Sequence, residues 1–356
     1  MAGRSTRPTL EEVAEAAGCS LATASKALAG RPEVAVATRV RVHAAAVELG
    51  YERRPRALAA QPKRRTILAA FDGFGSVYSA SVLEGAMAAA AKADVEVVVG
   101  LTPTVEEGGV DAAWLERRAA TGVLGILLVT ALLADGLHET TERLGVPVVC
   151  VDAKSRDLGS IVTVGSASWA GAALGTQHLI DLGHERIAFA GVNKDFDFAL
   201  ERYAGYRSAL ERSGIEPDPT LAFPGDTEYS TGFAIGTRIA RSPRPPTAIM
   251  CLCDAVALGV IEGARRSGLR TPERLSVVGF DDLQPAHWSS PALTTVRQPL
   301  RRMGALAART LLRMADGHEP DSTRIQLATS LVVRSSTAPP ADGEAGGEPG
   351  GDATAG

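Results

Sequence analysis

The stretch from Ser20 to Leu28 has two chemically different sides at helical spacing. Its small apolar residues share one side, and Leu21, Ala22 and Lys26 fall on the other. A lysine can donate to guanine O6 and N7, and short apolar side chains can contact thymine methyl groups. The stretch therefore predicts a helix that reads base edges in a major groove. For Leu21, the alternative is a cap over the core of its own domain.

Hydroxyl and guanidinium side chains surround this stretch. Such groups suit phosphate oxygens, which position a protein on DNA without specifying the base sequence. The expected phosphate contacts are Thr23, Ser25, Arg39 and Arg41. Thr9 and Ser20, each at the start of an expected helix, complete the predicted DNA-contacting set of this segment.

Three short helices would position these side chains. Thr9 and Glu12 have the spacing of a capping box, so a first helix is expected to begin there. Gly18-Cys19 interrupts the helical pattern, and Ser20 is an N-cap candidate for the second helix. A third helix is expected from about Thr38 to Leu49, before a glycine that suits a helix end. Two short helices with a tight turn and a third as brace predict a helix-turn-helix.

Five runs of residues follow one another in a characteristic order: Leu10–Ala14, Ala17–Ser20, Thr23–Leu28, Thr38–Arg41 and Glu48–Tyr51. This order resembles the headpiece of LacI/GalR-type bacterial transcription regulators. The resemblance implies a hinge helix after the headpiece that inserts a leucine into the minor groove and kinks the duplex.

The expected hinge departs from that pattern. Aligned without gaps, the leucine position holds Ala60, and the nearest leucine is Leu58. Either Leu58 acts in a shifted hinge, or the kink is weaker because alanine has less apolar volume. A basic linker that only touches phosphates is the alternative interpretation.

Charge is unevenly distributed along the chain. The 356 residues, enough for two or three domains, have a net charge of −4. Residues 1–66 hold twelve Lys and Arg against six Asp and Glu, a formal charge of +6, which leaves −10 for the remainder. A basic module on an acidic body is typical of a DNA-binding protein whose other part has a separate role.

Several function classes lack their sequence signals. The four cysteines, Cys19, Cys150, Cys251 and Cys253, have neither metal-ligand spacing nor a disulfide framework. No signal peptide, membrane-spanning apolar run, nucleophile elbow, P-loop or zinc-helix motif is found. We therefore expect a cytoplasmic, nucleoid-associated protein that is not an enzyme and has no metal, no cofactor and no membrane contact.

From Ile67 onward, short apolar runs alternate with helical segments, which predicts parallel, doubly wound sheets. The runs are too many for one compact sheet, so two lobes are expected. The expected organisation is a headpiece (1–51), a hinge (52–66), a two-lobed body (67–337) and a disordered tail (338–356) that lacks core-forming residues. Lobe 1 would comprise about 67–165 and 297–322, and lobe 2 about 166–296 and 323–337.

The body carries further matching runs, including His178–Ala188, Arg202–Tyr206, Ser276–Asp282 and Pro291–Gln298. In this order they too resemble LacI/GalR-type regulators. The resemblance implies an α/β, periplasmic-binding-protein-like core of two doubly wound lobes that dimerises and clamps a small effector. The expected fold class is thus an all-α helix-turn-helix headpiece joined to this core.

The effector site is expected at strand ends. Asp281 follows an apolar run, so its carboxylate should face the cleft, because ligands bind at the carboxyl ends of parallel strands. By resemblance, Arg202 and Asp281 bond hydroxyls or an anionic group of the ligand, and Tyr78 stacks on it. The alternatives are a turn cap for Asp281, a surface ion pair for Arg202 and a lobe-core role for Tyr78.

Two polar ligand contacts of the resembled family are weakened in this chain. Ala167 and Ser168 replace its usual Asp-Asn, and Cys253 replaces its usual Asn or Ser. The effector is therefore expected to be less hydroxylated than a simple sugar, unless another group compensates. Trp169, His287 and Trp288 are candidates for aromatic surface near the cleft. A redox role for Cys253 would need a depressed thiol pKa.

Together these features predict a homodimeric, sequence-specific repressor of transcription. Two headpieces would bind a palindromic operator with half-sites about one helical turn apart. An effector, a sugar or related metabolite, would bind between the lobes and change operator affinity. The alternatives are a solute-binding receptor of the periplasmic type and an enzyme built on the same cleft.

Overall fold

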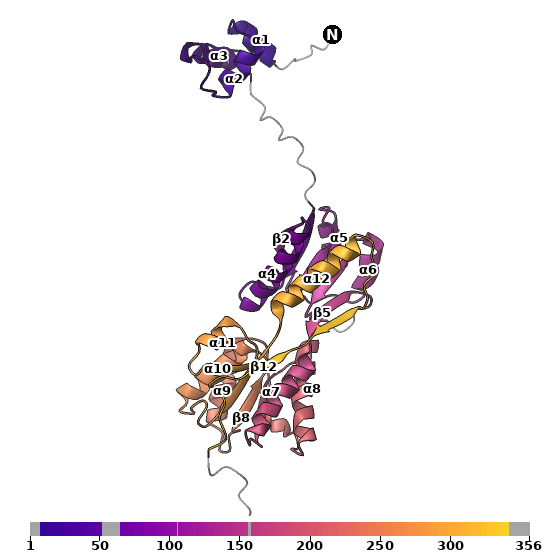
Figure 1. Ribbon diagram of the computed structural model, residues 1–356, viewed down its shortest axis with the longest axis vertical. Coiled ribbons are helices and arrows are strands. Elements are labelled where there is room, and N and C mark those ends of the chain that lie inside the picture. The colour runs from indigo at the N-terminus through magenta and orange to yellow at the C-terminus, as the bar shows by residue number, and fades with distance from the viewer. Residues whose placement is uncertain (1–7, 52–64, 105, 156–157, 342–356) are drawn as a thin grey trace, which may run out of the picture. The chain divides into compact units, whose positions relative to one another are not determined.

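The computed structural model describes residues 8–51, 65–104, 106–155 and 158–341. The chain divides between residues 64 and 65 into two compact units, a small helical unit and a larger α/β unit (Figure 1). Each unit is described by itself below. The expected hinge, apart from residues 65 and 66, lies outside the described residues.

The small unit contains three helices: α1 (Leu10–Ala16), α2 (Leu21–Leu28) and α3 (Val36–Glu48). Thr9 and Glu12 form the capping box that the sequence predicts, and Ser20 caps α2. Small side chains allow the three helices to pack closely around a core that includes Val13, Ala24 and Val42, all with no exposed surface. The predicted helix-turn-helix is confirmed, with the third helix starting two residues early.

The first sheet of the large unit has six parallel strands in the order β11-β5-β4-β3-β1-β2. The strands are β1 (Thr66–Phe71), β2 (Glu96–Leu101), β3 (Ile126–Val129), β4 (Val148–Val151), β5 (Val162–Ser166) and β11 (Arg324–Leu327). Its central strands β1, β3 and β4 are buried on both faces, which explains their continuous apolar sequence.

The second sheet has the order β12-β10-β9-β8-β6-β7, and only the β10–β12 pair is antiparallel. Its strands are β6 (Ile187–Val192), β7 (Ala222–Pro224), β8 (Ala248–Cys251), β9 (Ser276–Asp281), β10 (Thr294–Arg297) and β12 (Ser330–Val332). The two sheets define two lobes, as predicted.

Helices cover both faces of each sheet. In the first lobe, α4 (Val77–Lys92) and α12 (Leu300–Ala315) share one core with the sheet, and α5 (Ala112–Ala119) and α6 (Leu137–Leu144) share another. In the second lobe, α7 (Ser168–Asp181) and α8 (Asp197–Arg212) cover one face, and α9 (Tyr229–Ala240), α10 (Asp254–Arg266) and α11 (Gln284–Trp288) the other. A short 3-10 turn, Pro219–Leu221, precedes β7.

The helices α4 and α12 pack closely because each has a glycine at the contact. A Cβ on Gly85 would lie 1.9 Å from the Arg301 carbonyl oxygen, and one on Gly304 would lie 1.9 Å from the Val82 carbonyl oxygen. No side chain larger than hydrogen fits there without separating the helices. The contact holds the two helices against each other, and both begin at the edge of the lobe that faces the second lobe (Figure 1).

The expected lobe boundaries need correction near the C-terminus. The chain was predicted to stay in lobe 2 from residue 323, but β11 pairs in parallel with β5 in the first sheet. The chain thus crosses between the lobes three times, after β5, after β10 and after β11. The crossing near 297 also comes one residue later than predicted, since Arg297 still pairs with Asp281 in the second sheet.

The sequence prediction places the start of the disordered tail at residue 338, which is too early. The Ala338 amide donates to Ser276 Oγ at 3.0 Å, and the Ala338 carbonyl oxygen lies 2.9 Å from both Ser276 Oγ and His184 Nε2. Residue 338 is therefore part of the second lobe, held by backbone hydrogen bonds that composition does not reveal. Residues 342–356 lie outside the described residues.

Candidate functional sites

The exposed side of α2 matches the predicted base-reading surface. Ser20 Oγ accepts from the Thr23 amide at 3.2 Å and fixes the start of the helix. Ala24 and Ala27 are fully buried against the core, whereas Leu21 is 45% exposed and Lys26 is exposed. Leu21 does not join the core of the small unit, so the alternative of a core cap is not supported.

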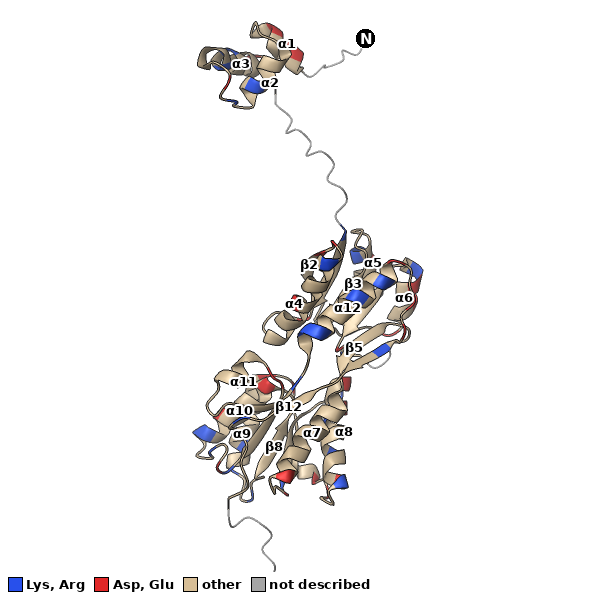
Figure 2. Cartoon of the chain, in the orientation of Figure 1, with Lys and Arg blue, Asp and Glu red and all other residues tan. Residues whose placement is uncertain are grey.

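Ala22 and Ser25 are also exposed on α2, and Thr23 is half-buried beside them. Lys26 Nζ lies 3.7 Å from Glu33 Oε1 in an exposed ion pair. Figure 2 shows the basic residue on α2 and the acidic residues on α1. The pair with Glu33 competes with any anion or base acceptor that Lys26 would meet.

The expected phosphate contacts are partly engaged within the unit itself. Thr9 accepts from the Glu12 amide at 3.3 Å in the capping box. Arg39 Nη2 donates to the carbonyl oxygens of Arg31 and Val34 at 3.2 and 3.1 Å, and Arg41 Nε donates to the Ala17 carbonyl oxygen at 3.4 Å. The two arginines therefore brace the turns around α2, and their phosphate contacts stay predictions. Leu58 and Ala60 lie outside the described residues.

In the second lobe, Arg202 and Asp281 come together as predicted. Arg202 Nη1 lies 3.7 Å from Asp281 Oδ1, and both side chains are almost fully buried. Arg202 also donates to the Leu252 carbonyl oxygen at 2.7 Å, and its guanidinium lies 3.7 Å from the centre of the Phe280 ring. The surface ion-pair alternative for Arg202 is wrong, because the pair lies inside the fold at the end of β9.

Two hydrogen bonds and one ion pair stabilise the Asp281 carboxylate. Gln298 Nε2 donates to Oδ1 at 2.6 Å, the Asp254 backbone amide donates to the carboxylate, and the Arg202 guanidinium forms the ion pair. Burial raises the pKa of Asp281 to about 6, although Arg202 and Gln298 act to lower it. Asp281 is therefore still mostly ionised at neutral pH, in a site where the charge is costly.

The first lobe contributes Tyr78 and Asp152. The Tyr78 hydroxyl, on α4, donates to Asp152 Oδ2 at 2.5 Å at the end of β4. Burial raises the pKa of both groups, and the charge of Arg202 lowers both, so this pair faces the guanidinium of the other lobe. Tyr78 thus lies at the site, but as a hydrogen-bond donor beside Asp152 and as part of the lobe core.

Ser168 and Cys253 are both buried, at the starts of α7 and α10. Ser168 lines a small hollow of about 70 Å³ with Asp152 and Phe198. Cys253 Sγ donates to the Thr227 carbonyl oxygen at 3.4 Å, and burial raises the pKa of its thiol. A raised thiol pKa argues against the redox role, which needs a thiolate.

The predicted aromatic surface lies elsewhere. Trp169 and Trp288 are 42% and 74% exposed, and neither lines the small hollow beside Ser168 or the larger hollow where α4 and α12 begin. Phe198 and Phe280 supply the rings instead, with ring centres 5.1 and 3.7 Å from the Arg202 guanidinium. Together with Asp152 and Gln298, these residues were missed by sequence reasoning. Asp152 had a usable signal, because it follows an apolar run as Asp281 does.

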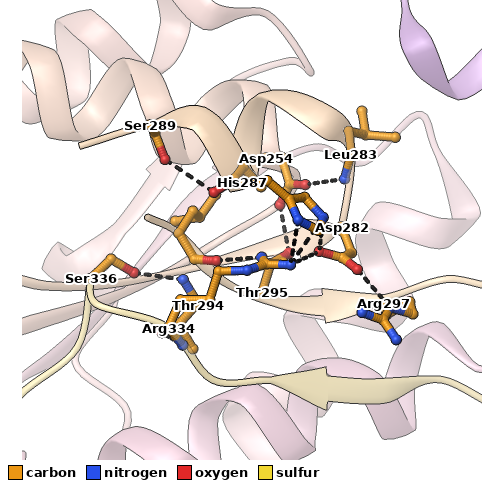
Figure 3. A network of polar contacts seen from close by, with 12 residues as sticks. Asp254, Asp282, Leu283, His287, Ser289, Thr294, Thr295, Arg297, Arg334 and Ser336 are labelled. Atoms are coloured by element: carbon orange, nitrogen blue, oxygen red, sulfur yellow. Dashed lines mark hydrogen bonds and ion pairs between the residues drawn. The ribbon is translucent and has the colours of Figure 1, made fainter. Parts of the chain in front are cut away.

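His287 belongs to a polar network around Asp282, the residue after Asp281, drawn in Figure 3. Asp282 Oδ2 accepts from Arg297 Nε at 2.6 Å, and Oδ1 accepts from Arg334 and lies 3.2 Å from His287 Nε2. In the same network, Asp254 accepts from Thr295 Oγ1 and from the Leu283 amide. The network fixes the loop that follows β9, where Asp281 and Asp282 both have positive φ angles.

Among the described residues, no group of three or more His, Cys, Asp or Glu could hold a metal ion. No helix in the described part of the chain is long and apolar enough to cross a membrane. The groups assembled between the lobes are hydrogen-bond donors, acceptors and aromatic rings, which suit binding of a small polar molecule.

Comparison with known proteins matches both units. The model of bacterial regulatory proteins of the lacI family matches residues 9–54, and that of periplasmic binding protein-like domains matches residues 176–337. The transcriptional repressor CytR of Escherichia coli (strain K12) is 30% identical over 335 residues, 93% of this chain and 97% of CytR. The chain belongs to the LacI family.

Other LacI-family members agree with this assignment. The transcriptional regulator CelR of Thermobifida fusca is 32% identical over 94% of this chain and 99% of its own. The structure of a CelR–cellobiose complex matches with a TM-score of 0.69 at 32% identity, over 93% of this chain and 100% of that chain. The lac repressor dimer bound to operator and the anti-inducer ONPF matches with a TM-score of 0.69 at 29% identity, over 94% and 100%.

The predicted family and fold class are therefore confirmed, and the chain is a transcriptional regulator with a DNA-binding helix-turn-helix. These matches support the regulator and not the solute-binding receptor. Its homologues are regulators rather than enzymes.

Proposed function

We propose that the chain is a homodimeric repressor that binds operator DNA through α2 and responds to a small metabolite bound between its lobes. The observation that carries this is the α2 surface, on which Leu21, Ala22 and Lys26 stand away from a well-packed core. A full-length likeness to a repressor dimer on its operator supports it. The function is binding without turnover, and it is exerted on DNA in the cytoplasm.

The edge of the first sheet supports the dimer. In β2, the last strand of the sheet, Val98, Val99 and Leu101 are 48%, 43% and 54% exposed, and Met87 on the adjacent α4 is 50% exposed. An apolar edge strand in contact with water invites association. A second copy of the chain covering this surface would remove apolar side chains of both protomers from solvent.

The effector site is proposed around Arg202 and Asp281. Arg202 Nε is buried and has no hydrogen-bond partner in the described chain. A buried donor without a partner is costly, so it favours a ligand that carries a hydrogen-bond acceptor. The aromatic walls and the buried Cys253 favour a sugar-like molecule with fewer hydroxyls than a simple sugar.

Footprinting of the purified full-length protein on DNA upstream of its own gene tests the proposal. We expect a protected, roughly symmetric site, with half-sites about one helical turn apart. Candidate sugars and related metabolites would then be titrated, with tryptophan fluorescence for binding and band shift for operator affinity. Absence of any symmetric protected site on genomic fragments at moderate salt would contradict operator binding. An Asp281→Asn variant that keeps the full response would contradict the effector site.

A further inference from the structure

A larger hollow lies beside the effector site, where α4 and α12 begin. Its volume is about 420 Å³, enough for a small metabolite. Three segments line it: the first turns of α4, the loop after β9 and the crossing from β10 into α12, which are residues 77–84, 281–284 and 297–302. The hollow is therefore built by both lobes.

The start of α12 is a positive end of a long helix. Pro299 is the N-cap residue and provides no side-chain cap. The amides of Leu300, Arg301 and Arg302 have no acceptor within the described residues. These free N–H groups carry partial positive charge, and the aligned dipoles of 16 helical residues add to it.

Three arginines and three acids line the hollow around this helix start. The acids in the lining already have basic partners: Glu84 lies 2.8 Å from Arg301, and Asp282 is held by Arg297 at 2.6 Å. Asp281 is paired with Arg202 in the effector site. Arg302 makes no ion pair with any described residue. The hollow therefore has an uncompensated guanidinium next to unsatisfied backbone amides.

One buried group in the lining lacks a partner. Gln298 is 4% exposed, and its Oε1 accepts no hydrogen bond in the described chain, because Nε2 is the atom directed to Asp281. A buried amide oxygen without a donor costs free energy that a ligand hydroxyl would recover. The hollow thus offers anion donors at one end and a hydroxyl acceptor at the other.

We propose that this hollow binds a small phosphorylated polyol, a ligand distinct from the one at Arg202 and Asp281. The phosphate would accept from the α12 amides and from Arg301 and Arg302, and a hydroxyl would donate to Gln298 Oε1. The ligand would touch α4 and α12 of the first lobe and the Asp281–Gln284 loop of the second. Its occupancy would favour the arrangement of the lobes that forms the hollow.

Calorimetric titration of the full-length protein tests the site without operator DNA and without the cleft effector. The probes are glycerol 3-phosphate, n-propyl phosphate, which has no hydroxyl, and glycerol, which has no phosphate. We expect saturable binding of glycerol 3-phosphate, weaker binding of n-propyl phosphate and none of glycerol. The double variant Arg301→Gln, Arg302→Gln should raise the Kd for glycerol 3-phosphate roughly tenfold, because two charge-assisted contacts are lost.

The matched control is the double variant Arg309→Gln, Arg313→Gln, which removes the same charge from the same helix far from its start. It should change the Kd less than about twofold, since distant exposed charges are screened. Three outcomes would overturn the site: no saturable binding by the unmodified protein, equal loss in both double variants, or equal affinity for the two phosphates. None of these results bears on operator binding, which the footprint tests separately.

Discussion

Replacement of Asp281 by Asn should change how stability depends on pH, by an amount that follows from its burial. Burial raises the Asp281 pKa from 3.8 to about 6, so the folded protein holds a proton that the unfolded chain has already released. The contribution of Asp281 to the free energy of unfolding therefore falls as pH rises from about 4 to about 6 and is level above that range. A difference of about 2 pH units corresponds to ~3 kcal/mol of unfolding free energy.

The Asn side chain does not titrate in this range, so the variant should lack the fall in unfolding free energy that comes from Asp281. Urea unfolding at fixed protein concentration, followed by tryptophan fluorescence between pH 4 and pH 7.5, measures it. The unmodified protein should lose ~3 kcal/mol more than Asp281→Asn across this range. At neutral pH, the variant also leaves Arg202 without its carboxylate partner, which offsets part of the gain.

The control is Asp321→Asn, whose carboxylate is 87% exposed. This variant should follow the unmodified protein at every pH. If Asp281→Asn has the same pH profile as the unmodified protein, the carboxylate is not the buried, proton-binding group that the contacts describe. Parallel titration with any effector found by fluorescence should show a weakened response in Asp281→Asn only.

Three further predictions concern single contacts. Ser20→Ala removes the cap of α2 and should lower the stability of the small unit by about 0.5–2 kcal/mol in thermal unfolding; no change would mean that the cap is not formed in solution. Glu33→Gln frees Lys26 and should raise operator affinity by less than about fivefold in band-shift titrations, whereas Lys26→Met should lower it. Tyr78→Phe removes a donor to buried Asp152 and should cost about 1–3 kcal/mol in urea unfolding at pH 7; a smaller loss than that of the exposed control Tyr229→Phe would refute the contact.

Sequence periodicity predicted the small unit almost completely because its signals are local. The Thr9 capping box and the Ser20 cap act within three residues, and Ala24 and Ala27 mark the buried side by their spacing. The outward position of Leu21 could not be decided from sequence, because a leucine beside a small core can either cover it or face solvent.

The central strands were also predictable, whereas the edge strands β11 and β12 were not. Strands such as β3 and β9 are buried along their whole length and appear as continuous apolar runs. The edge strands β11 and β12 are four and three residues long and only half-buried, so their sequences resemble loops. Strand β11 belongs to the first lobe through its pairing with β5, a long-range contact without a local signal.

The candidate site was predicted in part for the same reason. Asp281 could be found because it ends an apolar strand, and Arg202 came from the family resemblance. Their shared burial and the position of Phe280 under the guanidinium depend on how α8 packs against the second sheet. The roles of Asp152 and Gln298 depend on the approach of the lobes and on the crossing after β10, which no local pattern encodes.

The loop after β9 suggests how occupancy of the site could reach the rest of the first lobe. Asp281 and Asp282 have φ angles of 118° and 60°, which are strained for residues other than glycine. The strain is maintained because Arg297 and Arg334 hold the Asp282 carboxylate (Figure 3). Arg297 donates to the Asp282 carboxylate, and its neighbour Gln298 donates to the Asp281 carboxylate. A ligand that takes over Oδ1 of Asp281 would release Gln298, which lies on the crossing that leads directly into α12.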